Sequence, residues 1–302
     1  MRVGAFTVRH TTLSATGPQP ALVDEDPASD DEGAAFAKTL ERSFDAPYAI
    51  EAHPSIPSTN DRARELAAEG RSDVVVIADE QPRGRGRRNR GWTGPAGGIY
   101  ASVLLRPDRP PGEAPLFTLA GAVAAVFACE SVGVDAGIKR PNDVLVGADE
   151  GGDVKSAVES GDRGGRKLAG VLTETETEGD RLSWLVVGIG INANVDPGTL
   201  PSGATSLRDE LGDAVDRRVA IRELLNRFHD LASDLGAVLP AWRERAFTLG
   251  RRVRVETNGE TIVGTAVDVT RPGALVIETS AGRRTLHAGE CTHLRRAGPG
   301  TD

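Results

Sequence analysis

GRGRRNRGW, residues 84–92, places four arginines among glycines in a chain whose net charge at neutral pH is −8. Glycine lets a backbone adopt positive φ and come close to a ligand. Arginine presents a planar fork of donors that suits carboxylate and phosphate. The stretch lacks the lysine and the serine or threonine that close a P-loop. Two interpretations follow: a solvated flexible loop, or a mobile clamp that becomes ordered on an anionic ligand.

The composition limits the classes of protein to which the chain can belong. With 44 acidic and 36 basic residues, attraction to nucleic acid or a membrane surface through net charge is not expected. Cys129 and Cys291 lie far apart without metal or redox spacing, which fits a reducing cytoplasm. No signal peptide is recognised at the N-terminus. Residues 115–134 are nearly long enough to span a bilayer, but their alanine and glycine content and Glu130 favour a buried helix.

Three regions are expected along the chain. Residues 1–45 hold an acidic tract and little apolar periodicity, which predicts a weakly ordered segment. Residues 46–248 combine short apolar strands with helices, the first of which has an N-cap signal at Ser58. From residue 251 to 294 the apolar period becomes two, which predicts a small all-β barrel of about five strands within residues 249–296. Strands are expected at 73–79, 98–105, 137–146, 167–174 and 183–192, and helices at 58–70, 115–134, 219–235 and 240–247.

Three further segments lie at or beside the ends of predicted strands, where a rigid sheet positions functional loops. Residues 139–143 (KRPND) form a turn that offers an amide and a carboxylate, although taken alone they indicate no more than a turn. Residues 167–174 (KLAGVLTE) begin with one of only four lysines, a compact charge suited to a reacting phosphate. Residues 188–194 (GIGINAN) permit close approach of a ligand or a strand.

Together the four segments resemble the catalytic domain of biotin protein ligases, in composition and in order. That family carries a Gly-Arg-Gly-Arg-x-Gly-Arg-x-Trp loop, a Lys-Trp-Pro-Asn-Asp turn, a Lys-Leu-x-Gly-Ile-Leu strand and a Gly-Ile-Gly-Ile-Asn strand. With the cap at 58–60 and the C-terminal β-region, the resemblance covers residues 46–294. Asn89 stands where the family has glycine, and Arg140 where it has tryptophan. Residues 1–45 show no counterpart of the family's helix-turn-helix domain.

The resemblance implies an α+β fold, with a mixed, mostly antiparallel sheet flanked by helices, of the class II synthetase or biotin–lipoate ligase type. Residues 46–248 would form the biotin- and ATP-binding catalytic domain, and 249–296 a C-terminal SH3-like barrel. The implied activity is cytoplasmic: MgATP activates biotin to biotinyl-5′-AMP, and a lysine of a biotin carboxyl carrier protein then receives the biotin. Neither specific DNA binding nor membrane association is expected, and a homodimer is left open.

The resemblance also assigns roles to individual residues. The catalytic residues are Lys167, Arg87 and Arg85, with Lys167 bridging the biotin carboxylate and the α-phosphate. The biotin-binding residues are Ser58, Thr59, Asn60, Gln81, Arg85, Gly86, Arg87, Lys167 and Gly170. The nucleotide-binding residues are Arg87, Arg90, Trp92, Asn142 and Asn192. Asp143 is assigned either to Mg²⁺ or to the incoming lysine, and the sequence leaves that choice open.

Three alternatives are weighed against biotin ligation. Lipoate or octanoate ligation on the same fold is disfavoured by the intact Gly-Arg-Gly-Arg and Lys-Leu-Ala-Gly segments. RNA binding through the arginine loop predicts interleaved stacking aromatics, but only Trp92 lies near and aromatic residues make up 4% of the chain. A biotin-sensing repressor requires a DNA-reading helix that residues 1–45 do not show.

Overall fold

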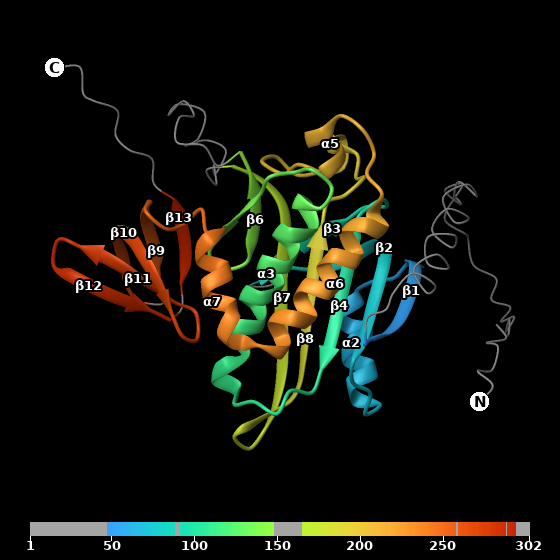
Figure 1. Ribbon diagram of the computed structural model, residues 1–302, viewed down its shortest axis with the longest axis horizontal. Coiled ribbons are helices and arrows are strands. Elements are labelled where there is room, and N and C mark those ends of the chain that lie inside the picture. The colour runs from blue at the N-terminus through green and yellow to red at the C-terminus, as the bar shows by residue number, and fades with distance from the viewer. Residues whose placement is uncertain (1–46, 88–90, 148–164, 258, 288, 294–302) are drawn as a thin grey trace, which may run out of the picture.

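The computed structural model describes residues 47–87, 91–147, 165–257, 259–287 and 289–293. Within these residues the protein has a mixed α+β architecture. A central eight-stranded sheet is flanked by helices, and a second sheet of five strands follows toward the C-terminus (Figure 1). The acidic segment 1–45 and most of the connection 147–166 lie outside the described residues.

The central sheet is mixed and mostly antiparallel, as predicted. Its order is β1-β2-β4-β8-β7-β6-β5, with β3 paired to β2. Only the β1–β2 pair is parallel. The strands are β1 (Ala49–Ser55), β2 (Val74–Arg85), β3 (Gly91–Gly94), β4 (Ile99–Leu105), β5 (Gly137–Lys139), β6 (Asp143–Val146), β7 (Arg166–Glu178) and β8 (Arg181–Ile191). β1 and β3 were not predicted, and β2 extends into the arginine stretch.

Five α-helices are described around the sheet: α2 (Thr59–Ala68), α3 (Ala114–Glu130), α5 (Leu207–Leu211), α6 (Arg217–Ser233) and α7 (Leu235–Glu244). Short 3₁₀ turns lie at η2 (Pro111–Glu113) and η3 (Pro197–Thr199). The predicted cap of α2 is confirmed, because the Ser58 side chain accepts a hydrogen bond from the Asp61 amide. The prediction that a helix begins at Pro240 is wrong by five residues. The Asp234 side chain accepts from the Gly236 amide and starts α7 earlier, with Pro240 inside the helix.

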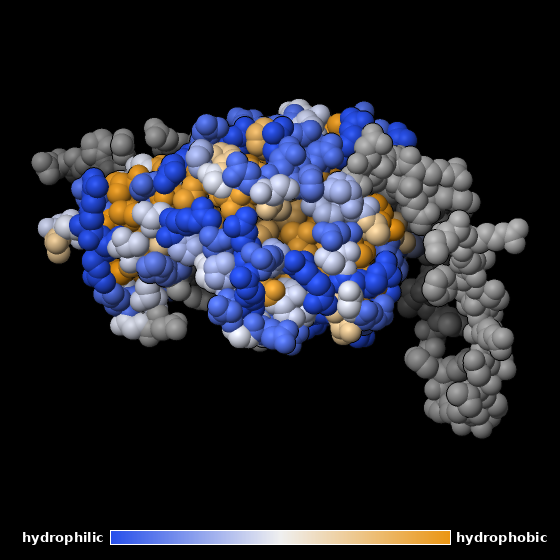
Figure 2. All heavy atoms as spheres, turned by 60° about the horizontal axis from the view of Figure 1, so that its bottom comes forward, coloured by the Kyte–Doolittle hydropathy of each residue, from blue (hydrophilic) through white to orange (hydrophobic). Residues whose placement is uncertain are grey.

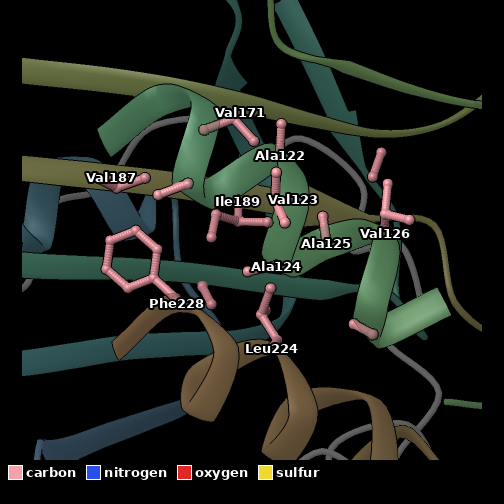
Figure 3. Packing of buried hydrophobic residues seen from close by; sticks show 14 of the residues in the cluster. Ala122, Val123, Ala124, Ala125, Val126, Val171, Val187, Ile189, Leu224 and Phe228 are labelled. Carbon is pink, nitrogen blue, oxygen red and sulfur yellow. The ribbon is translucent and has the colours of Figure 1, made fainter. Parts of the chain in front are cut away.

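The two faces of the sheet carry different side chains because successive residues of a strand point to opposite faces. In β2, Val75 and Ile77 belong to the main core beneath α3 and α6, whereas Val74 and Val76 pack with α2 on the other face. Figure 3 shows Val187 and Ile189 of β8 beside α3, with Phe228 of the neighbouring helix α6 next to them. The main apolar core therefore lies on the α3 and α6 face of the central strands, and a smaller apolar cluster lies under α2 on the other face.

The apolar helix α3 is a core helix, as predicted. Residues 111–130 are the one described stretch long and apolar enough to cross a membrane, but 67% of that window is buried inside the protein. Gly121 lets the helix approach the sheet closely, since a Cβ there would lie 3.1 Å from Val171 and Val187. The helix thus packs through small residues against β7 and β8.

The C-terminal sheet is antiparallel throughout, in the order β12-β11-β10-β9-β13. Its strands are β9 (Arg252–Glu256), β10 (Thr261–Thr270), β11 (Ala274–Thr279), β12 (Gly282–Leu286) and β13 (Glu290–His293). It has a small core of its own, which includes Val255, Leu275 and Ile277. Arg243 of α7 ties it to the larger body through Asp268 (2.7 Å) and the Val269 carbonyl (2.7 Å).

The surface is largely polar. Figure 2 shows hydrophilic residues over much of one face, with hydrophobic residues between them. Among the described residues, the large hydrophobic side chains that count as exposed are Leu211 (43%) and Val263 (36%).

Candidate active site: a cationic cavity on the glycine face of the sheet

A cavity of about 190 Å³ lies on the face of the sheet opposite α3. Its walls come from the start of α2, the arginine stretch, β4, β7, β8, the β5–β6 turn and β13. The predicted site residues that line it are Ser58, Thr59, Asn60, Gln81, Arg85, Gly86, Arg87, Trp92, Asn142, Asp143, Lys167 and Gly170. Twelve residues separated by as many as 112 positions in the sequence therefore meet in one place.

Glycines at alternate positions create the space. In β8, Val187 and Ile189 are buried in the core beneath α3, so Gly188 and Gly190 face the cavity. A Cβ on Gly188 would lie 2.0 Å from the Asn60 side-chain oxygen. A Cβ on Gly190 would lie 2.9 Å from the Trp92 indole, and one on Gly170 would lie 3.0 Å from the same ring. The three glycines thus seat Asn60 and Trp92 directly on the sheet.

One end of the cavity is neutral and built of hydrogen-bonding groups. The Gln81 side-chain oxygen accepts from both the amide and the hydroxyl of Thr59, each at 2.8 Å. The Ser102 hydroxyl lies 2.8 Å from the Thr59 hydroxyl and 2.6 Å from the Asn60 side-chain oxygen. All four residues are at most 8% exposed. Such a buried, mutually bonded set fixes its donors and acceptors in place before a ligand arrives.

A carboxylate links this neutral end to the arginine stretch. Glu174 of β7 accepts from the Asn60 side-chain amide at 2.6 Å and from Arg85 at 3.2 Å. Arg85 also pairs with Asp61 at 2.7 Å. Burial alone would raise the pKa of Asp61, but hydrogen bonds from Arg64 and Arg85 outweigh it, so the pKa lies below its usual value. Arg85 is therefore held between two carboxylates.

The middle of the cavity is occupied by Lys167, whose ammonium lies 2.5 Å from Asp143. The same ammonium stands 5.1 Å from the centre of the Trp92 ring, within the range of a cation–π contact. Asp143 pairs with Gly170 across the β6–β7 ladder. Lys167 is thus fixed by a charge on one strand and by an aromatic face on another.

Arg87 and Asn142 meet at the rim. The Arg87 guanidinium donates to the Asn142 side-chain oxygen at 3.3 Å, and the Asn142 amide donates to the Val171 carbonyl at 2.8 Å. Arg90 lies outside the described residues. Asn192 lies away from the cavity lining: it is buried, and its side-chain amide donates to the Thr205 carbonyl at 2.9 Å.

The cavity concentrates positive charge in an acidic protein. Among its described lining residues, one is acidic, Asp143, and five are cationic: Arg85, Arg87, Lys139, Arg140 and Lys167. The described part of the chain contains no group of three or more His, Cys, Asp or Glu side chains that could hold a metal ion. This arrangement suits a ligand that carries several negative charges at one end and hydrogen-bonding groups at the other.

Two residues of the polar network were missed by sequence reasoning. Ser102 is fully buried in the apolar strand β4, and its hydroxyl is the hub between Thr59 and Asn60. A lone serine in the apolar run 98–105 is the signal that could have identified it. Glu174 is the first acid of the run 174–178, in which threonine and glutamate alternate. The alternation gave no reason to choose one glutamate over the next.

The chain is similar to enzymes of one family over most of its length. The model of the Biotin/lipoate A/B protein ligase family matches residues 52–192, and that of the Biotin protein ligase C terminal domain matches residues 248–294. The Bifunctional ligase/repressor BirA of Bacillus subtilis is 32% identical over 250 residues, which are 79% of this chain and 72% of the relative. The Biotin--[acetyl-CoA-carboxylase] ligase of Mycobacterium tuberculosis is 34% identical over 251 residues, which are 79% of this chain and 86% of that relative.

A solved structure agrees with these relatives. The biotin protein ligase from Aquifex aeolicus in complex with biotin and ATP has a TM-score of 0.63 and 25% identity, with 83% of this chain and all of that chain covered. The sheet, the cavity and the four segments thus define a ligase of the biotin and lipoate class. The chain belongs to the biotin/lipoate A/B protein ligase family.

Gly188→Ala should lower the free energy of unfolding by about 1–3 kcal/mol. The new methyl group would displace Asn60 and break its bonds to Ser102 and Glu174. Urea denaturation measures the change. Gly112→Ala is the matched control, because nothing lies within 4 Å of a Cβ at Gly112. Equal stability of the two variants would contradict the packing of Asn60 on Gly188.

Proposed function

We propose that the protein is an ATP-dependent biotin–protein ligase that forms biotinyl-5′-AMP and transfers biotin to a lysine of a carrier protein. The observation that carries the proposal is the polarity of the cavity, which is neutral and hydrogen-bonding at the α2 end and cationic beyond it. Biotin has the same polarity, with an uncharged ureido ring at one end and a carboxylate at the other. The relatives and the solved complex with biotin and ATP support the same assignment.

The order of strands in the sheet determines the sequence in which the lining residues follow one another along the cavity. Ser102 on β4 pairs with Gly188 on β8, Gly190 pairs with Gly170 on β7, and Gly170 pairs with Asp143 on β6. The ureido ring would therefore bind beside Thr59, Asn60 and Gln81. The carboxylate of biotin would reach Lys167 near β6.

In the first half-reaction, a carboxylate oxygen of biotin attacks the α-phosphorus of ATP. The new P–O bond forms as the bond to the β-phosphate breaks, and pyrophosphate leaves with the electron pair. Negative charge grows on the α-phosphoryl oxygens, where the ammonium of Lys167 would stabilise it. No nucleophile from the protein is required, because the substrate carboxylate supplies one.

In the second half-reaction, the neutral amine of an acceptor lysine attacks the carbonyl carbon of the mixed anhydride. The bond from that carbon to the phosphate oxygen breaks, AMP leaves, and the nitrogen loses a proton as the amide forms. Arg85 and Arg87 would cover the adenylate between the two steps, so that water is kept from the anhydride. A carrier protein whose lysine reaches the cavity completes the reaction.

Mg²⁺ would enter with the nucleotide. Magnesium is commonly bound by one or two carboxylates together with substrate phosphates, so a cage of protein ligands is not needed. Asp143, the one acidic residue in the described lining, is the residue that would hold it. The ion would neutralise phosphate charge. Arg90 and Asn192 remain proposed nucleotide contacts; the Asn192 side-chain nitrogen is bonded to the Thr205 carbonyl, and its side-chain oxygen has no hydrogen-bond partner among the described residues.

The regional assignments complete the proposal. Residues 46–248 would form the catalytic domain, and residues 249–296 an SH3-like barrel built from the five antiparallel strands β9–β13. The acceptor would be a biotin carboxyl carrier domain, and the reaction would take place in the cytoplasm. The family-model match at residues 248–294 supports a separate C-terminal domain in this region.

Biotin is preferred to lipoate or octanoate because of the neutral end. The Thr59, Asn60 and Gln81 groups are buried polar groups that a ureido ring can bond. A hydrocarbon tail or a dithiolane ring offers them neither donors nor acceptors, so it gains no hydrogen bonds at this end of the cavity. Labelling of a purified carrier domain, read with avidin, is therefore expected to require both ATP and biotin. An enzyme that instead attaches octanoate or lipoate to the carrier, detected by mass spectrometry, would contradict the proposal.

Lys167→Ala should abolish adenylate formation while biotin binding stays nearly intact. A lost donor to developing charge costs about a hundredfold to a thousandfold in rate, whereas the ureido contacts lie elsewhere in the cavity. Quenched-flow chromatography of biotinyl-5′-AMP and calorimetry with biotin measure the two effects. The neighbouring Arg166→Ala is the matched control, since Arg166 is exposed and pairs with Glu210 at 2.7 Å. A Lys167→Ala rate within threefold of the wild type would refute the assignment.

Arg87→Ala should release biotinyl-5′-AMP into solution rather than only slow catalysis. Arg87 bonds Asn142 across the rim, and its loss would open the cover more often. The escaped adenylate is expected to label bystander lysines. Avidin blotting of the carrier mixed with an unrelated lysine-rich protein measures this, with Arg83→Ala as the control, because Arg83 is exposed and outside the described lining. Labelling confined to the carrier would show that Arg87 does not retain the adenylate.

A further inference from the structure

Glu174 of β7 stands behind the neutral end of the cavity. The described lining includes Asn60 but neither Glu174 nor Ser102. The Glu174 carboxylate accepts a hydrogen bond from the Asn60 side-chain amide at 2.6 Å. Both of its oxygens also lie 3.2 Å from a terminal nitrogen of Arg85. Glu174 therefore acts on a ligand through the side chains that it holds.

The carboxylate fixes which way the Asn60 amide points. A carboxylate accepts hydrogen bonds and cannot donate them. The atom of Asn60 that faces Glu174 must therefore be the amide nitrogen, and the oxygen must face the Ser102 hydroxyl, which lies 2.6 Å away. The oxygen and the nitrogen of an asparagine amide have nearly the same size, so packing alone does not distinguish the two orientations. The charge of Glu174 decides between them.

A row of three oxygen–oxygen contacts continues from Asn60 across the neutral end. The Ser102 hydroxyl lies 2.6 Å from the Asn60 oxygen and 2.8 Å from the Thr59 hydroxyl. The Thr59 hydroxyl lies 2.8 Å from the side-chain oxygen of Gln81, which also accepts from the Thr59 backbone amide at 2.8 Å. Both ends of the row are thus acceptors. Because the two hydroxyls supply two hydrogens for three contacts, the row is one hydrogen short.

Reversal of the Asn60 amide would remove this shortage. Its nitrogen would then donate to the Ser102 hydroxyl, which could in turn donate to Thr59. The Thr59 hydroxyl could donate to Gln81, so that every contact would have a hydrogen of its own. By holding the amide in the other orientation, Glu174 keeps the row in need of one more donor.

Thr59 presents this need to a ligand, because it is the hydroxyl of the row that lines the cavity. Its own hydrogen is used inside the row, so the hydroxyl offers the ligand a lone pair. A ligand that displaces water from it must bring a donor or lose affinity. The ureido ring of biotin carries two N–H groups, which are donors of this kind.

We propose that Glu174 is a positioning residue that sets the donor and acceptor pattern of the neutral end, and that this end thereby selects acids with N–H donors remote from their carboxylate. The inference rests on the proposed function and deepens it. The carboxylate orients the Asn60 amide, the amide orders the two hydroxyls, and Thr59 is left to accept. Glu174 itself does not touch the substrate.

Calorimetric titration of the full chain with biotin, without ATP, tests the inference. Glu174→Gln keeps the size of the side chain but can present either an oxygen or an amide to Asn60, so it no longer fixes the orientation. We expect biotin to bind about tenfold more weakly, roughly the loss of one hydrogen bond. Glu176→Gln is the matched control, because Glu176 lies on the same face of β7, bonds the Trp184 indole and is outside the described lining. This control should bind biotin as the wild type does.

Biotin methylated on one ureido nitrogen gives a readout that a purely structural role would not change. The methyl group removes one N–H donor and adds the same bulk whichever variant is titrated. With the isomer that the wild type rejects more strongly, the ratio of the dissociation constants for methylated and unmodified biotin should fall about fivefold in Glu174→Gln, since that variant no longer needs the donor. An unchanged ratio would overturn the inference.

Transposing the two groups gives a second test at constant total charge. In the double variant Asn60→Asp with Glu174→Gln, residue 60 carries only oxygens, so the row again ends in an acceptor beside Ser102. The double variant should bind biotin more tightly than Glu174→Gln alone, because the two changes are coupled. Equal or weaker binding by the double variant would reject the inference.

Arg85 offers a competing explanation, since Glu174 also pairs with it. Asp61→Asn removes the other carboxylate of Arg85, at 2.7 Å, and leaves the bond between Asn60 and Glu174 in place. If Asp61→Asn weakens biotin binding as much as Glu174→Gln does, Glu174 acts through Arg85 and the inference is wrong. Wild-type protein that does not bind biotin would refute the proposed function, whereas tight wild-type binding that Glu174→Gln leaves within about twofold would refute this inference alone.

Discussion

The site depends on three positions of the sheet that must lack a Cβ atom, namely Gly170, Gly188 and Gly190. Because a strand alternates its faces, Val187 and Ile189 can support α3 while the glycines between them leave room on the other side. Asn60 and Trp92 then settle on the sheet itself. The neutral hydrogen-bonding end and the seat of Lys167 both follow from that close approach, since Asn60 belongs to the first and Trp92 faces the second.

The charge of the lining residues is the second feature on which the site depends. An acidic chain with a net charge of −8 gathers five cationic residues around one cavity. Two of them are held by carboxylates: Arg85 by Asp61 and Glu174, and Lys167 by Asp143. Holding the cations in place before substrates bind reduces the reorganisation needed when charge develops on a phosphate. Arg140 differs from these two, because the described residues offer it carbonyl oxygens and no carboxylate.

Sequence reasoning predicted the elements whose signals are local. The Ser58 cap, the apolar helix α3 and the period of two beyond residue 249 all appear in the structure. It did not predict β1 or β3, because strand pairing and not composition makes them strands. It also missed Ser102 and Glu174, whose roles depend on which residues face Asn60 across neighbouring strands. The short helix α5 and the early start of α7 rest on side-chain caps at Ser206 and Asp234 that were not weighed.

The most direct test of the proposed chemistry is exchange of labelled pyrophosphate into ATP by the purified protein, without an acceptor. Exchange requires that the carboxylate attack the α-phosphorus and that the step reverse, so it reports activation of the acid alone. We expect rapid exchange with biotin, and none with octanoate or lipoate, because only the ureido ring offers donors and acceptors to the buried polar groups of Thr59, Asn60 and Gln81. Exchange supported by octanoate or lipoate but not by biotin would contradict the account.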